Sequence, residues 1–262
     1  MAGLGGRWAW LVGVRPHGAG GSEPYHGLLI PEAGSHVIQD AAALGEAPGR
    51  EMKAPVLICE LDVERVDAIE WLRGAGWTEE RRLRFWRLNL ASNADRIRIL
   101  REEAQRKLEG RGIAIATVAE LGGETFLRRL HLVGQGASAD IPGSYEYVPE
   151  PYEEWVVWLQ SPSVHLDRLW VATLGGDPIG YSFLAYRPSV VETGFTGVLR
   201  EHRGKGVARA LKLETLVQAI ELGVTTVETD NDSENAPILH LNEALGYAEI
   251  PGKIAFHRKL SR

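Results

Sequence analysis

A strand, a glycine-bearing turn and a long helix follow one another without interruption between Glu192 and Ala210 and beyond. Residues 191–199 have the apolar density of a strand, and residues 205–223 form the clearest amphipathic helical pattern of the chain. The first N–H groups of a helix lack internal partners and lie at the positive end of its dipole. A turn with little side-chain bulk lets them contact an anion, so this order predicts an α/β chain with a phosphate-binding turn.

The turn, residues 203–206, carries two basic side chains and two glycines. Arg203 and Lys205 add positive charge, whereas Gly204 and Gly206 permit backbone conformations and close approaches that a Cβ would hinder. A glycine pair also suits a helix cap that binds no anion. Its place between a strand and a periodic helix favours the anion-binding interpretation.

The spacing Arg203-x-x-Gly206-x-Ala208 resembles the Gln/Arg-x-x-Gly-x-Gly/Ala signature of the GNAT superfamily of N-acetyltransferases, which holds the pyrophosphate of coenzyme A. Asn235 and the pair Gly246-Tyr247 stand where many members carry an Asn and a Gly-Phe-like pair. The resemblance implies that the cofactor is acetyl-CoA. The cofactor-binding residues that it implies are Val198, Arg203, Gly204, Lys205, Gly206, Val207, Ala208, Asn235 and Asn242.

The resemblance also implies a mechanism. The backbone N–H of Thr196 would face the thioester carbonyl, where a donor placed for the developing oxyanion contributes a few kcal/mol. Glu192, six residues before Val198, would remove the proton from an amine whose pKa lies near 10; an exposed strand-end glutamate is the alternative. Many members place a tyrosine acid where this chain has Asn242, so the thiolate would leave unassisted or be protonated by water.

An internal repeat is predicted by a short pattern that occurs twice. Ala75-Gly76-Trp77 and the strand after it have the same order as Leu245-Gly246-Tyr247 and the final strands. The pattern Thr229-x-Asn231, Asn235 and Asn242-x-x-Leu245-Gly246-Tyr247 resembles a GNAT subgroup that includes tandem-domain, mycothiol-synthase-like proteins. The implied fold is a mixed central sheet flanked by helices, preceded by a degenerate and shortened GNAT-like half. The expected domains are 1–90 (structural), 91–111 (a connecting helix) and 112–262 (the complete acetyltransferase domain).

The first half would begin near its own fourth strand, with Val14-Arg15-Pro16 as a degenerate counterpart of the cofactor loop. Sheet edges left exposed in such a half need cover from the second domain or from another subunit, as in a homodimer.

Apolar spacing predicts the remaining elements. These are strands at 7–14, 56–61, 82–90 and 112–121, a turn-rich break at 17–27, helices at 37–44, 66–72, 91–110, 124–133 and 152–160, a loop at 134–151 and a hairpin at 169–187.

The acceptor pocket is expected, by the same resemblance, in the helical region and Pro/Gly loop before the hairpin. Acidic and aromatic side chains there would hold a cationic amine. The candidates are Asp140, Tyr145 and Trp155, together with Glu153, Glu154 and Trp158. Trp155 and Trp158, three positions apart, are more often one buried helix face.

Composition excludes several classes of function. The net charge of −6 argues against a nucleic-acid scaffold, and no window approaches the roughly 20 apolar residues of a membrane helix. The lone Cys59 excludes an internal disulfide and a cysteine-rich zinc site. His131, His202 and His240 show no ligand spacing, so no metal is predicted. We read no signal peptide and expect a cytoplasmic protein.

The predicted function is transfer of an acetyl group from acetyl-CoA to a primary amine of a small-molecule acceptor. One alternative is an acyl-CoA-binding or regulatory module without catalysis, motivated by Asn242 at the tyrosine position. Another is an acyltransferase that uses a longer acyl chain or acts on a protein N-terminus. The residues alone do not identify the acceptor.

Overall fold

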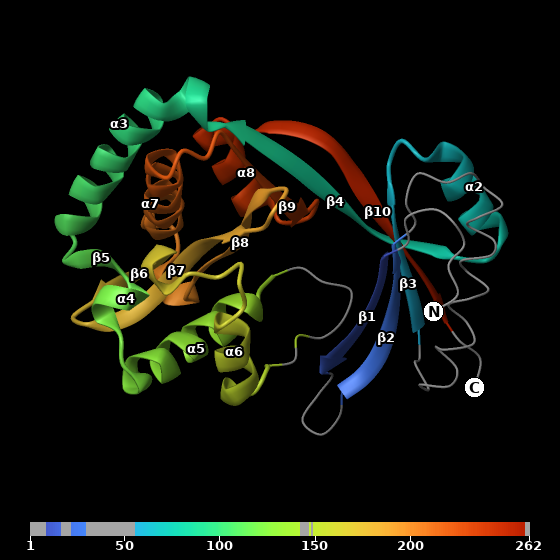
Figure 1. The fold of residues 1–262 in the computed structure, drawn as a ribbon, viewed down its shortest axis with the longest axis horizontal. Coiled ribbons are helices and arrows are strands. Elements are labelled where there is room, and N and C mark those ends of the chain that lie inside the picture. Colours follow the sequence, from blue (N-terminus) through green and yellow to red (C-terminus); the bar gives the residue numbers. More distant parts are fainter. Residues whose placement is uncertain (1–8, 17–21, 30–55, 142–146, 148, 260–262) are drawn as a thin grey trace.

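The computed structural model describes residues 9–16, 22–29, 56–141, 147 and 149–259. They build one ten-stranded sheet with helices on its faces (Figure 1). The strands, in sheet order, are β1 (Ala9–Pro16), β2 (Ser22–Leu29), β3 (Val56–Asp62), β10 (Ala248–Lys259), β4 (Thr78–Asn89), β9 (Thr226–Asp232), β8 (Val191–Val198), β7 (Asp177–Tyr186), β6 (Leu169–Leu174) and β5 (Ile113–Thr117).

The helices cover both faces of the sheet. α3 and α7 lie on one side of β6, β7 and β8, and α5 and α6 lie on the other (Figure 1). The helices are α2 (Val66–Gly74), α3 (Leu90–Glu109), α4 (Val118–Leu121), α5 (Glu124–Ser138), α6 (Tyr152–Leu159), α7 (Val207–Glu221) and α8 (Ala236–Leu245), with short 3₁₀ turns η1 (Leu166–Arg168) and η2 (Arg200–His202). Among the described residues, no helix is long and apolar enough to cross a membrane.

A β-α-β segment occurs twice with a constant offset. β3, α2 and β4 start at Val56, Val66 and Thr78, and β9, α8 and β10 start 170 positions later in each case. The pairing follows the same symmetry: Leu83 of β4 lies opposite Asp232 of β9, and Lys253 of β10 opposite Asp62 of β3. The last strand of each repeat therefore pairs with the first strand of the other repeat. β4 and β10 run side by side between the two halves (Figure 1).

The start of the first half differs from the expectation. Residues 22–29 form a strand, not a turn-rich break, because pairing with β1 and β3 overrides the local turn preference of glycine and proline. β1 and β2 are antiparallel and β2 and β3 are parallel, which repeats the pattern of β7, β8 and β9. By this pattern β1 corresponds to β7 of the second half. Val14-Arg15-Pro16 is therefore the end of a strand and not a degenerate cofactor loop. The expected helix at 37–44 lies outside the described residues.

Helix α5 is longer than expected, and residues 134–138 belong to it. A Cβ on Gly134 would lie 2.7 Å from the hydroxyl of Tyr181, and one on Gly136 would lie 2.9 Å from Leu199. Both glycines therefore serve close packing of the helix on the sheet and do not end it. The expected strand at 112–121 is shorter, because Thr117 begins α4 in a capping box with Glu120.

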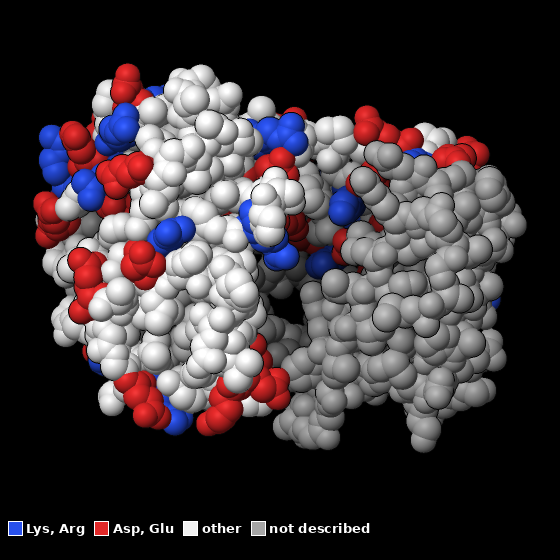
Figure 2. All heavy atoms as spheres, in the orientation of Figure 1, with Lys and Arg blue, Asp and Glu red and all other residues white. Residues whose placement is uncertain are grey.

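Helix α7 is not amphipathic in its packing. It is covered by α3 on one side and by the sheet on the other (Figure 1), and it buries even Lys212, Glu214 and Thr215. Glu214 accepts a hydrogen bond from Nε of Arg101 on α3 at 2.9 Å. Helix α3 carries the alternating acidic and basic surface expected of a solvated face (Figure 2).

Candidate active site

The turn before α7 has the backbone that its glycines predict. Gly204 and Gly206 have φ values of 70° and 86°, in the left-handed region that side chains with a Cβ rarely adopt. The N–H of Ala210 donates to the carbonyl of Gly206 at 3.1 Å and is the first to find a partner one helical turn back. The N–H groups of Val207 and Ala208 have no such partner, so the helix start can receive an anion.

The basic side chains of the turn hold the loop together. Arg203 donates from Nε to the carbonyl of Val198 at 2.8 Å and pairs through Nη1 with Asp140 at 2.8 Å. Lys205 donates from Nζ to the carbonyl of Glu201 at 2.8 Å. The predicted attraction for a phosphate would come from the backbone N–H groups, with the two cations close by.

Asp140 has a different place from the one expected. It pairs with Arg200 and Arg203, which hold the pKa of its carboxyl below the ordinary value, Arg200 having the larger effect. It lies after the end of α5 and fastens that helix to the cofactor loop. It does not line the cavity described below, because its carboxylate is drawn to these two arginines. Tyr145 lies outside the described residues.

Strand β8 separates from β9 beside this loop. Within the described strands the two pair only at Glu192 and Glu228. A β-bulge at Gly194 changes the register with β7, from Phe195 opposite Phe183 to Thr193 opposite Leu184. Beyond the bulge, the β9-facing edge of β8 is therefore open to an extended ligand.

The N–H groups of Thr196 and Val198 point to that open edge. The N–H of Leu199 donates to the carbonyl of Ile179 at 2.9 Å, which makes this a hydrogen-bonded antiparallel pair. Hydrogen-bonded and non-bonded pairs alternate, so Val198 and Thr196, opposite Gly180 and Ser182, direct their N–H groups away from β7. This is the direction that contact with a thioester requires; the contact itself stays a prediction.

Three further predicted residues are placed as follows. Glu192 forms an ion pair with Arg187, Oε1 to Nε 2.6 Å, and its side chain is 32% exposed. Asn242 is fully buried and donates from Nδ2 to Oδ1 of Asn231 at 2.7 Å; its contact with a cofactor stays a prediction. Asn235 is half-buried at the start of α8, where its contact with a cofactor stays a prediction.

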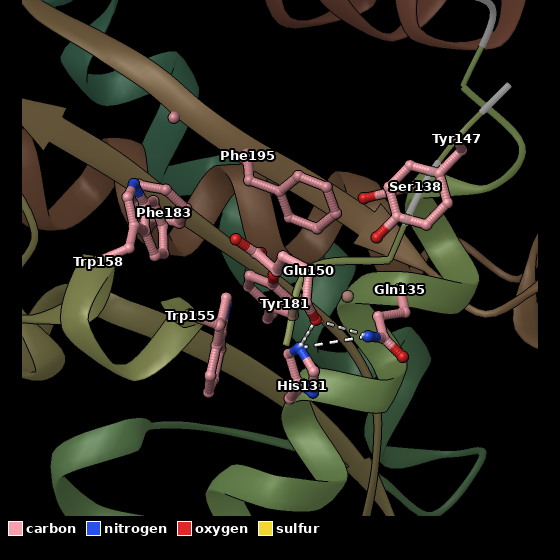
Figure 3. A pocket seen from close by; sticks show the side chains of 12 residues that line it. His131, Gln135, Ser138, Tyr147, Glu150, Trp155, Trp158, Tyr181, Phe183 and Phe195 are labelled. Carbon is pink, nitrogen blue, oxygen red and sulfur yellow. Dashed lines mark hydrogen bonds between the residues drawn. The ribbon is translucent and has the colours of Figure 1, made fainter. Parts of the chain in front are cut away.

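A cavity of about 180 Å³ lies beside β8 on the face of the sheet that α5 and α6 cover (Figure 3). Its lining comes from α5, α6, the segment before α6, β7 and β8. The residues are His131, Gly134, Gln135, Ser138, Tyr147, Glu150, Trp155, Trp158, Tyr181, Phe183, Gly194 and Phe195. Because Gly194 and Phe195 immediately precede Thr196, the cavity adjoins the position expected for the thioester.

Glu150 is the carboxylate of this cavity. Its backbone carbonyl accepts hydrogen bonds from Nε2 of His131 and Nε2 of Gln135, both at 3.0 Å (Figure 3). Burial raises the pKa of its carboxyl above the ordinary value and Glu154 adds to the effect, whereas His131 opposes it. A carboxylate with a raised pKa is suited to binding a cation or taking up a proton.

Two of the aromatic residues predicted for the acceptor pocket line this cavity. Trp155 lines it and is buried, and Trp158 also lines it with 39% of its surface exposed. Glu153 and Glu154 are exposed on α6 and do not line it. Sequence reasoning missed Glu150, although a carboxylate just before an aromatic helix was a usable signal. In the described ranges, no group of three or more metal-ligating side chains is present.

Comparison with known proteins agrees with this arrangement. Residues 137–247 match the acetyltransferase (GNAT) family. A GCN5-related N-acetyltransferase from Sphaerobacter thermophilus aligns with a TM-score of 0.69 and 16% identity, over 90% of this chain and 72% of that one. A tandem GNAT protein from the clavulanic acid biosynthesis pathway aligns with a TM-score of 0.62 and 18% identity, over 91% of this chain and 76% of that one.

A GCN5-related N-acetyltransferase from Kribbella flavida aligns with a TM-score of 0.60 and 14% identity, over 91% of this chain and 82% of that one. None of the curated proteins with which the sequence was compared matches it significantly. At these identities the solved structures show the fold, and the family match applies to residues 137–247. That range contains the hairpin, β8, the cofactor loop and α8. Residues 137–247 therefore match the acetyltransferase (GNAT) family, and the chain shares the fold of GCN5-related N-acetyltransferases.

Proposed function

We propose that the protein transfers an acetyl group from acetyl-CoA directly to a primary amine of a small molecule. The observation that carries this proposal is the continuity of two features. A strand with the N–H groups of Thr196 and Val198 directed to an open edge leads straight into a turn whose Gly204 and Gly206 expose a helix start. The first suits an extended amide-containing arm and the second suits a pyrophosphate.

The chemistry is one acyl transfer. The amine nitrogen attacks the thioester carbonyl carbon, a C–N bond forms, and the C–S bond breaks with its electron pair going to sulfur. The N–H of Thr196 would stabilise the negative charge that develops on the carbonyl oxygen. The amine proton passes to a carboxylate, and Glu192 and Glu150 are the two candidates. The buried Asn242 supplies no acid, so the leaving thiolate takes its proton from solvent.

Calorimetry with acetyl-CoA tests the donor site. We expect binding by the unaltered protein and its loss in a Gly206→Glu variant, which places a carboxylate where the pyrophosphate would lie. Gly74→Ala is the matched control, because it adds a Cβ to a distant glycine with nothing within 4 Å. Binding that survives Gly206→Glu would remove the loop from the proposal.

A second candidate is an acyl-CoA-binding module without turnover, favoured by the buried Asn242 at the position of the family's acid. Thiol release with a panel of amines, including a peptide with a free N-terminus, separates the candidates. Turnover of any small amine supports the enzyme, and binding without thiol release supports the module. Turnover of the peptide alone would move the acceptor to a protein N-terminus.

We also propose that residues 1–90 act structurally. What supports this is the strand exchange, in which β3 and β4 complete the sheet around β9 and β10. Residues 91–111 then connect this part to the acetyltransferase domain at 112–262. The role of the first half is to cover sheet edges that would otherwise be exposed.

A further inference from the structure

The cavity beside β8 carries information about the acceptor. We propose that it binds a primary amine attached to one aromatic ring or a similarly compact apolar group, with Glu150 as the counter-ion of the ammonium. This inference rests on the proposed acetyl transfer. It starts from position, because Gly194 and Phe195 line the cavity immediately before Thr196, the predicted oxyanion donor.

Aromatic rings form half of the cavity lining. Tyr181 and Phe195 have ring centroids 4.7 Å apart, and Trp158 packs edge-on against Phe183 at 5.3 Å. An apolar group on the acceptor is stabilised here because its surface is removed from water. Gln135, Ser138 and Tyr147 add polar groups at other points of the lining. The rings therefore favour an acceptor that carries an apolar group.

The size of the cavity limits that apolar group. An engineered apolar cavity of about 150 Å³ holds benzene, and this cavity measures about 180 Å³. One ring with a short arm fits this space. A fused polycyclic system or a long alkyl chain would extend out of it.

A single carboxylate sets the charge of the acceptor. Among the described residues that line the cavity, Glu150 is the only Asp or Glu, and its side chain lies among the rings of Trp155, Tyr181 and Phe195 (Figure 3). Burial raises the pKa of its carboxyl, so a cation would relieve an unfavourable environment. The surrounding ring faces also attract an ammonium. One counter-ion fits a monoamine better than a polyamine.

Three ligands separate the charge from the ring in a calorimetric test, with the protein saturated with coenzyme A. They are 2-phenylethylamine, ethylamine (the charge without the ring) and 2-phenylethanol (the ring without the charge). We expect 2-phenylethylamine to bind at least about tenfold more tightly than either of the others, because it alone uses both Glu150 and the rings.

Variants then assign each contribution. Glu150→Gln should weaken 2-phenylethylamine about tenfold and leave 2-phenylethanol unchanged, since it removes the charge and keeps the shape. Trp158→Ala should weaken both ring-bearing ligands. Glu153→Gln is the matched control, an exposed carboxylate on α6 outside the cavity, and should change nothing. Circular dichroism confirms that each variant is folded.

The outcomes separate this inference from the proposed function. Equal affinity for 2-phenylethylamine and ethylamine, or no effect of Glu150→Gln, overturns the assignment of the cavity. If ethanolamine releases thiol from acetyl-CoA and 2-phenylethylamine does not, the proposed function stands and this inference falls. If acetyl-CoA does not bind and no amine releases thiol, the proposed function falls, and the same calorimetry with the three ligands on the protein without coenzyme A still decides what the cavity binds.

Discussion

The Nε atom of Arg203 donates a hydrogen bond to the carbonyl oxygen of Val198 at 2.8 Å, and so fastens the cofactor loop to the strand that precedes it. Arg203→Ala frees that carbonyl and also breaks the pair with Asp140. We expect the Kd for acetyl-CoA to rise about tenfold, because the loop loses its fixed geometry and a nearby cation. Calorimetry measures the change. Lys205→Ala, which loses only one contact to a loop carbonyl, should have a much smaller effect; equal effects would contradict a positioning role.

A second prediction concerns the bulge residue Gly194. A Cβ there would lie 2.1 Å from the ring of Phe183, so Gly194→Ala forces that ring into the cavity. We expect a higher KM for the amine and an unchanged Kd for acetyl-CoA. The cavity lies on the face of the sheet that α5 and α6 cover, whereas acetyl-CoA is expected along the β9-facing edge of β8. Steady-state thiol release and calorimetry measure the two quantities. A parallel loss of both would show that the bulge shapes the donor site instead.

The two candidate bases make opposite predictions for the pH–rate profile. Glu192 is engaged by Arg187 at 2.6 Å, whereas burial raises the pKa of Glu150. If Glu150 takes the amine proton, activity falls as the pH drops through its raised pKa, and Glu150→Gln abolishes this acidic limb. Glu192→Gln should then keep it. Loss of the limb in Glu192→Gln alone would assign the proton to Glu192.

Much of this site was predictable because its signals are local. Gly204 and Gly206 carry positive φ as their spacing suggested, and the strand, turn and helix follow in the predicted order. The errors arise where distant packing decides. Gly134 reads as a helix breaker, yet it lies inside α5 because Tyr181 approaches so closely. The amphipathic pattern of residues 205–223 predicts a polar face, yet α3 covers α7 and Lys212 and Glu214 are buried. A sequence window contains neither Tyr181 nor α3, so no local pattern reveals these contacts.

The buried Lys212 predicts a pH-dependent stability. Burial lowers its pKa from 10.5 to about 7, with Thr193 Oγ1 3.5 Å from its Nζ. Between these pH values the unfolded chain holds a proton that the folded protein does not, so this group destabilises the fold less and less as the pH rises from about 7 to about 10.5. Lys212→Met should therefore raise the free energy of unfolding by a few kcal/mol at pH 7, and by less at pH 9.5.

Urea denaturation at the two pH values measures this difference. Lys107→Met, at an exposed position on α3, is the matched control and should give a near-zero change at both. A stabilisation by Lys212→Met that is equal at pH 7 and pH 9.5 would mean that Lys212 does not titrate in this window. The comparison uses differences between variants, so other titrating groups cancel.

The exchanged strands predict that the two halves unfold together. Trp86 of β4 is buried in the core shared with α3 and α7, and Phe256 of β10, 170 positions later, is buried in the core against α2. Each side chain thus packs in the half to which its repeat does not belong. Trp86→Ala and Phe256→Ala should each cost about 3–5 kcal/mol. Because β4 pairs with β10, both should shift one common denaturation transition, followed by circular dichroism and tryptophan fluorescence. A second, separate transition in Phe256→Ala would show that the halves are stable independently.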